Sequence, residues 1–166
     1  MSKTANSTLN LYHKCRRLPF GNKIFSLLVS RMAPYFGSIK PIITQLEPNY
    51  CECLLRKRRA VENHIGTVHV IAICNGLEMA MAMGVMAEAS IPPHLRWIPK
   101  GMTLDYTAKA GSDIRCVAKV DANAWQPGDL DVEVLAYDSN DILVVKGNIR
   151  LWISAKPAKN ATEKGS

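Results

Sequence analysis

One stretch in the middle of the chain, from Asn63 to Ala89, is apolar on nearly every side. It is long enough for a helix of more than about five turns. A helix that is apolar all round has to be buried, either inside a protein or inside a bilayer. Asn75 and Glu78 lie in its middle, and a buried carboxylate is costly unless it is hydrogen-bonded or used chemically. The pattern therefore directs the search for chemistry to this helix.

Apolar residues at helical spacing also occupy residues 7–33, with a break at residues 19–21 and a stop before Pro34. We expect two short amphipathic helices packed on a larger body; contact of their basic face with a membrane is the less favoured alternative. Strand-like patterns follow. They cover residues 39–47, 50–58, 100–109, 113–122, 129–138 and 142–153. The first two strands would form a hairpin before the apolar helix, and the last four a meander after it.

This order predicts an α+β fold in which a curved antiparallel sheet wraps one long central helix. The expected domains are an N-terminal helical arm (1–37), the main domain (38–154) and a disordered tail (155–166). A single sheet would leave part of the helix and one edge strand uncovered. We therefore expect a homodimer or a dimer of dimers.

Composition narrows the functional classes. The 166 residues carry a net charge of +7, but no nucleic-acid-binding module accompanies the basic runs, so no nucleic-acid partner is expected. Glu78 and Asn75 argue against a membrane span. Five cysteines without framework spacing predict free, mostly buried thiols in a reducing cytoplasm, and the first residues lack the features of a signal peptide.

The residues around the helix start carry a family resemblance. Asn63, His69 and Glu78 have the spacing of the PaaI-like branch of hotdog-fold acyl-CoA thioesterases, over roughly residues 39–153. Still closer is the similarity to a hotdog subgroup with no assigned reaction, which carries N-H-x-G-T-x-H and W-I-P-K-G-M. The resemblance implies a hotdog fold and hydrolysis of a thioester at a dimer interface, with coenzyme A as part of the substrate. No metal and no redox cofactor are implied.

In one respect the chain departs from the PaaI-like pattern. The family's two glycines after the histidine are Val70 and Ile71 here. Glycines at a helix N-terminus let a thioester carbonyl approach the backbone N–H groups closely. Val70 can still donate its N–H to an oxyanion, but its side chain narrows the approach. This departure favours the alternative function, a non-catalytic protein that binds an acyl thioester.

The resemblance assigns roles that compete with structural ones. Glu78 is the candidate catalytic carboxylate and would act as general base or as nucleophile. The alternative is a structural role, in which a buried Glu78 pairs with a cation or a backbone group. Asn63 is the candidate residue that positions the attacking water or the thioester carbonyl. The alternative is that Asn63 has only a structural role, as a helix-capping or turn residue. His69 orders the oxyanion loop, or is hydrogen-bonded to backbone without direct catalysis. Backbone N–H of Val70 is the expected oxyanion donor. His64 and His69 show no third ligand, so no metal site is expected.

The remaining candidates concern substrate binding. Asn75, three residues before Glu78, would bond its carboxylate or line the acyl pocket. The basic run Arg56-Lys57-Arg58-Arg59 suits coenzyme A phosphates, or is a solvated charge run. Lys100 and Arg96 are weaker candidates for the same role. Methionines of the central helix are expected to pack in the core or line an acyl cavity.

Helix geometry constrains how the candidates can cooperate. At about 100° and 1.5 Å per residue, His69 and Glu78 lie on opposite helix faces and about 13.5 Å apart along the axis. They cannot form one site within one chain. Cooperation would require His69 of one subunit to face Glu78 of its partner.

Overall fold

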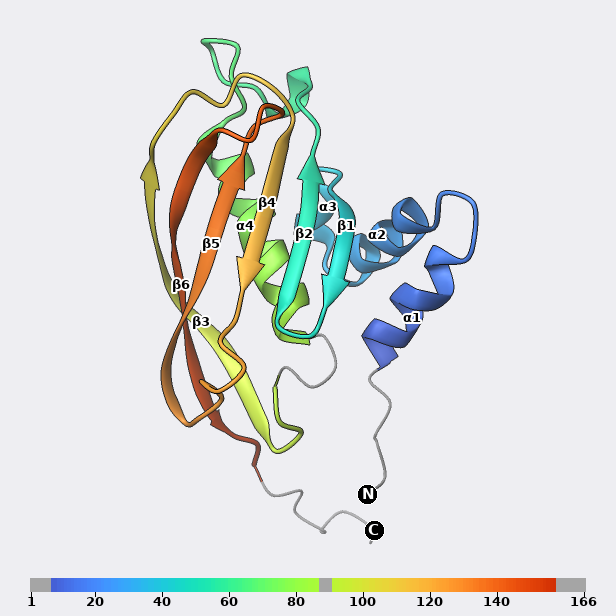
Figure 1. Ribbon diagram of the computed structural model, residues 1–166, viewed down its shortest axis with the longest axis vertical. Coiled ribbons are helices and arrows are strands. Elements are labelled where there is room, and N and C mark those ends of the chain that lie inside the picture. The colour runs from blue at the N-terminus through green and yellow to red at the C-terminus, as the bar shows by residue number, and fades with distance from the viewer. Residues whose placement is uncertain (1–6, 87–90, 158–166) are drawn as a thin grey trace, which may run out of the picture.

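The computed structural model describes residues 7–86 and 91–157, and it shows a curved antiparallel sheet wrapped around one long helix, α4 (Figure 1). The helices are α1 (Ser7–Arg16), α2 (Gly21–Met32), α3 (Pro34–Gly37), the 3-10 turn η1 (Arg59–Val61) and α4 (Val70–Met86). The strands are β1 (Ile42–Glu47), β2 (Tyr50–Leu55), β3 (Leu95–Tyr106), β4 (Ile114–Lys119), β5 (Gly128–Tyr137) and β6 (Leu143–Ala155). The predicted α+β hotdog architecture with N-terminal helices is confirmed.

The strand order differs from the predicted meander. The six-stranded sheet has the order β1-β2-β4-β5-β6-β3, so β3 pairs with β6 at the far edge and not with β4. Residues 107–113 do not make a hairpin turn but return across the start of α4, where Val68 N–H donates to the Ala110 carbonyl at 2.9 Å. The prediction of a meander was wrong, because turn residues indicate where a strand ends but not which other strand it pairs with.

Helix α4 begins later than the apolar pattern predicted. Residues 63–69 form a loop, since the Asn63 side chain bonds the loop backbone and Gly66 has a left-handed φ of 72°. Residues 87–89, included in the predicted helix, lie outside the described residues. The same holds for residues 158–166 of the predicted disordered tail.

The inner face of α4 packs chiefly on β2 and β4. Gly76 lies there beside two thiols: the Cys53 thiol donates to the Gly76 carbonyl at 3.3 Å, and a Cβ at Gly76 would lie 2.8 Å from the Cys116 Sγ. All five cysteines are free and four are buried, as predicted. Glu78, by contrast, is only half-buried, because α4 is not covered on its whole circumference.

The edge strand β1 is covered by the N-terminal arm, which here means helices α1–α3 (Figure 1). The Ser26 hydroxyl oxygen accepts the Ile43 backbone N–H at 2.7 Å. The Thr44 carbonyl accepts the Tyr12 hydroxyl at 3.1 Å and the Asn22 amide at 3.4 Å. These side chains satisfy backbone groups that an edge strand would otherwise expose to pairing with other chains.

Within residues 7–86 and 91–157, no helix has the length and apolar character required to cross a membrane.

Candidate functional site

The loop before α4 is built around the Asn63 side chain. Its Oδ1 accepts the backbone N–H groups of Ile65 and Thr67 at 3.2 and 3.1 Å, and its Nδ2 donates to the Thr67 hydroxyl at 2.7 Å. Two backbone hydrogen bonds, from Asn63 to Thr67 and from Gly66 to Asn63, close the same loop. Asn63 therefore shapes the entrance to α4 through its own loop contacts.

His69 is the N-cap of α4. Its Nδ1 accepts the Ile71 backbone N–H at 3.1 Å, and its backbone N–H donates to the Val61 carbonyl at 2.7 Å. A cap of this kind satisfies one of the donors that every helix leaves open at its first turn. The neighbouring donor, the N–H of Val70, has no acceptor among the described residues. The positive end of the helix dipole thus presents one backbone N–H to an incoming anion or carbonyl oxygen.

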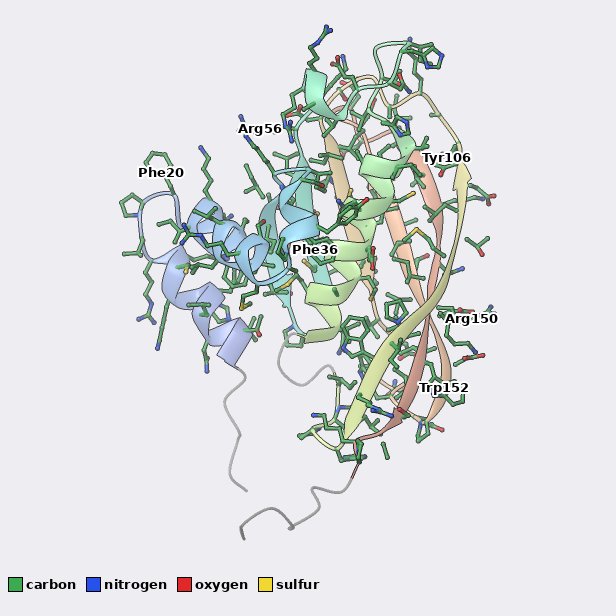
Figure 2. All side chains as sticks on the ribbon, turned by 180° about the vertical axis from the view of Figure 1, so that it is seen from behind. Phe20, Phe36, Arg56, Tyr106, Arg150 and Trp152 are labelled. Atoms are coloured by element: carbon green, nitrogen blue, oxygen red, sulfur yellow. The ribbon has the colours of Figure 1, made fainter. Side chains whose placement is uncertain are left out.

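One stripe of α4 is not covered by the sheet or the arm. Ile71 is 56% exposed. Cys74 and Glu78, which lie three and seven residues after Ile71 and therefore on the same helix face, are both half-buried. Tyr106 at the end of β3 borders this stripe, with its hydroxyl 3.8 Å from the Cys74 Sγ (Figure 2). We call these four residues the open face.

Glu78 is the acidic group of the open face. No hydrogen bond or ion pair joins it to any other residue within 7–86 and 91–157. Its neighbours on the helix, Leu77 and Met79, are fully buried. The carboxylate therefore sits at the rim of an apolar surface with its hydrogen-bonding capacity unused.

Asn75 turns away from Glu78. It is buried, and its Nδ2 lies 3.3 Å from both the Tyr35 carbonyl and the Ser38 hydroxyl, which connects α4 to α3. Its Oδ1 is buried without a partner among the described residues. The side chain holds the arm against α4 and makes no contact with the carboxylate of Glu78.

The basic candidates lie in two separate places. Arg56 and Arg59 are exposed beside the loop that leads to α4, while Arg58 donates to the Ser38 carbonyl at 3.1 Å. Lys100 pairs with Asp129 at 2.7 Å and lies 5.1 Å from the Trp152 ring centroid.

Lys100 belongs to the outward face of the sheet, because its partner Asp129 alternates with the inward-facing Leu130 on β5. Figure 2 shows Arg56 and Trp152 near opposite ends of the molecule. The structure does not bring Lys100 to the other predicted residues.

Tyr106 is a candidate that the sequence did not reveal. Partial burial, with a smaller contribution from Cys74, raises the pKa of its hydroxyl above the ordinary value, so it remains a hydrogen-bond donor at neutral pH. Met102 and Leu104 precede it at strand spacing and pack against the core, which places Tyr106 on the same side of β3. That alternation was the available signal, but it required knowing where β3 lies relative to α4.

Comparisons with known proteins identify the family. A family model described as a domain of unknown function (DUF4442) matches residues 21–153, and the chain belongs to that family. The crystal structure of the structural-genomics protein APC5556 is 41% identical, covers 90% of this chain and 99% of its own, and superposes with a TM-score of 0.78. None of the curated proteins matches the sequence.

More distant structures share the fold. PA5026 of Pseudomonas aeruginosa, described as a probable thioesterase, is 21% identical over 84% of this chain and 97% of its own, with a TM-score of 0.70. The thioesterase HI1161 of Haemophilus influenzae is 7% identical over 80% of this chain and 92% of its own, with a TM-score of 0.66. The chain thus shares the hotdog fold of these two proteins.

Proposed function

We propose that this DUF4442 protein hydrolyses an acyl-CoA thioester at a site formed between two copies of the chain. The observation that carries the proposal is Glu78, a half-buried carboxylate with no partner among the described residues, on a helix face that neither the sheet nor the arm covers within 7–86 and 91–157. A half-buried carboxylate whose hydrogen-bonding capacity is unused requires an explanation, and a functional role is one such explanation. The fold shared with thioesterases supports the choice of reaction.

A second copy would bring the two halves of the site together. The N-terminus of α4 and Glu78 are about 13 Å apart along the helix axis, which is too far for one thioester group. Strand β3 is a long edge strand that, among the described strands, pairs with β6 alone, and the open face lies beside it. Pairing of two β3 edges would set the α4 helices side by side in a homodimer, two of which can assemble further.

In this arrangement the Val70 N–H receives the thioester oxygen as it becomes negatively charged. Glu78 of the partner either removes a proton from the attacking water or attacks the carbonyl carbon itself. On the base route, the bond between the acyl carbon and sulfur breaks, the protonated Glu78 returns its proton to the thiolate, and the acid is released. On the nucleophile route, breaking that bond leaves a mixed anhydride between the acyl group and Glu78. The thiolate then takes a proton from the water that attacks the anhydride, and this attack releases the acid and regenerates the carboxylate. Asn63 and His69 would act by holding the entrance loop, and Arg56 and Arg59 would contact the coenzyme A phosphates.

One observation favours a second function. The Ile71 N–H, which is the next donor of the first helical turn, is already bound to His69 Nδ1 at 3.1 Å. Only one backbone donor is left for an oxyanion, and the Ile71 side chain is exposed beside it. The alternative is therefore a protein that binds an acyl thioester without hydrolysing it.

Thiol release from a panel of acyl-CoA substrates tests the proposal. Glu78→Gln should lower the rate about 100-fold or more. Glu133→Gln, which neutralises an exposed carboxylate on β5, is the matched control and should keep the wild-type rate. Equal turnover by wild type and Glu78→Gln would refute the catalytic role. Acyl-CoA binding without turnover in either protein would select the binding function.

The oligomeric state is tested separately by sedimentation. We expect a dimer or tetramer, and a monomer at assay concentration would refute the shared site. We also expect a cytoplasmic protein, because all five cysteines are unpaired. The proposed reaction requires neither a metal nor a redox cofactor.

A further inference from the structure

The net charge of the protein is confined to its N-terminal region. Residues 1–46 contain seven of the 21 Lys and Arg residues and no Asp or Glu, while the remaining 14 basic residues are matched by all 14 acidic ones. The N-terminal region therefore carries the whole net charge of +7, and residues 47–166 are balanced. No Lys or Arg of residues 7–41 forms an ion pair within the described part of the chain.

The same region exposes apolar side chains. Eight of the fourteen exposed large apolar residues that the structure describes lie between residues 11 and 35. They are Leu11, Leu18, Phe20, Ile24, Leu27, Leu28, Met32 and Tyr35. More than half of the exposed large apolar side chains thus lie in a short part of the chain, and exposed apolar surface that gathers in one region marks an interaction site.

Helix α2 is apolar on two opposite faces. Phe25 and Val29 are buried against the rest of the protein. On the other face, Phe20, Ile24 and Leu27 recur at helical spacing and are exposed. We call this outer surface, together with Leu18, the arm face.

The turn between α1 and α2 forms the tip of the arm face. Phe20 is 75% exposed and Leu18 is 54% exposed. Figure 2 shows Phe20 at the outer end of the arm, far from Tyr106 and the open face. Phe20 has a left-handed φ of 59°, a conformation that disfavours bulky side chains, and its ring lies 5.3 Å from the Lys23 ammonium. An apolar ring held exposed in a costly conformation points to a contact outside the chain.

Two cations lie next to the apolar tip in the chain. Arg17 lies in the turn itself, and Lys23 follows Phe20 by one turn of helix. A groove of about 470 Å³ continues from there between α2 and the start of β1. Its basic residues are Lys23, Arg31 and Lys40, and its apolar residues include Leu27, Pro41 and Ile42.

We propose that the arm face binds the surface of a membrane that contains anionic lipids. Leu18 and Phe20 would insert between the headgroups, α2 would lie along the interface, and the cations would bind lipid phosphates. Apolar insertion combined with a cluster of Lys and Arg is the physical signature of interfacial binding. A second copy of the chain is a poor occupant, because two faces with this positive charge repel each other.

Flotation with lipid vesicles tests the proposal on the full chain without substrate, so its outcome does not depend on the thioesterase assignment. The vesicles are phosphatidylcholine alone and phosphatidylcholine mixed with phosphatidylglycerol, because an anionic surface attracts Lys and Arg by about 1 kcal/mol per residue. The wild-type protein should float with the anionic vesicles, and 0.5 M salt, at which the Debye length is only about 4 Å, should weaken binding.

Phe20→Asn should reduce vesicle affinity about tenfold, because it removes one inserted aromatic side chain. Asn is tolerated in the left-handed region, so this variant should fold at least as well as wild type. Its control, Ile142→Asn, removes an exposed apolar residue at a turn of the main domain. Arg17→Gln with Lys23→Gln should lower binding by about tenfold or more, and Lys109→Gln with Lys146→Gln should leave it unchanged.

Failure of the wild-type protein to float with anionic vesicles would overturn the proposal. So would equal flotation of Phe20→Asn and Ile142→Asn. Binding to polyglutamate at 150 mM salt without vesicle binding would assign the arm face to an acidic protein. A change in oligomeric state of Phe20→Asn in the absence of lipid would instead show that a second copy covers it.

Discussion

His69 Nδ1 and the Ile71 backbone N–H are joined by a 3.1 Å hydrogen bond at the first turn of α4. This bond caps the helix and leaves the Val70 N–H as the donor of the first turn that has no acceptor among the described residues. The histidine thus has a structural function that needs no substrate. Any catalytic contribution of its imidazole has to be separated from this cap.

Replacement of His69 separates the two roles. His69→Ala should lower the free energy of unfolding by about 0.5–2 kcal/mol through loss of the cap, whereas His69→Asn should retain most of the stability. Urea denaturation measures both. If thiol release survives in His69→Asn, the residue acts through the cap; if release is lost although the helix is still capped, the imidazole itself takes part.

The contact between Ser26 and Ile43 predicts a second effect on stability. Ser26→Ala leaves the Ile43 N–H without its acceptor behind α2, which should cost about 1–3 kcal/mol. Ser30→Ala, one turn further along α2, is the control and should change stability by less than about 0.5 kcal/mol. Equal effects of the two substitutions would show that the hydroxyl does not secure the edge strand.

Two glycines of α4 should respond in opposite directions to alanine. A Cβ at Gly76 would lie 2.8 Å from the Cys116 Sγ, so Gly76→Ala should destabilise by about 1–3 kcal/mol. A Cβ at Gly84 meets nothing closer than 3.5 Å, and Gly84→Ala should stabilise by up to about 1 kcal/mol. Cys116→Ala should restore most of the stability lost in Gly76→Ala. Additive losses in that double variant would contradict the predicted clash.

Thiol labelling should identify Cys74 as the one cysteine that reacts rapidly in the native protein. Burial raises the pKa of Cys51, and a hydrogen bond with Cys53 together with burial raises that of Cys116, both well above the ordinary value. A raised thiol pKa means less reactive thiolate at neutral pH. In dilute native protein, a thiol reagent should therefore react rapidly at Cys74 alone, and Cys74→Ala should abolish this reaction. Rapid labelling that persists in Cys74→Ala would contradict the burial of the other four thiols.

Labelling of Cys74 also reports on the proposed dimer. Cys74 belongs to the open face, so its reaction should slow as protein concentration rises and the second copy covers it. Dilution should restore the rate. A rate independent of concentration, in protein shown by sedimentation to be dimeric, would place the interface elsewhere.

Local patterns were sufficient for much of the fold. Helical spacing identified α1 and α2, and two-residue alternation such as Val132 and Val134 identified β5, because the side-chain period of an element is a local property. The segregation of charge into residues 1–46 is likewise present in the sequence alone. The Asn63, His69 and Glu78 spacing also predicted the two ends of the proposed site, and this stays a prediction.

Contacts between distant residues decided the rest. The pairing of β3 with β6, the turning of Asn75 toward Tyr35, and the commitment of Lys100 to Asp129 all join residues far apart in the chain. The same is true of the uncovered stripe that leaves Glu78 half-buried. Periodicity states which side of an element is apolar, but which side is covered depends on what the folded chain places against it.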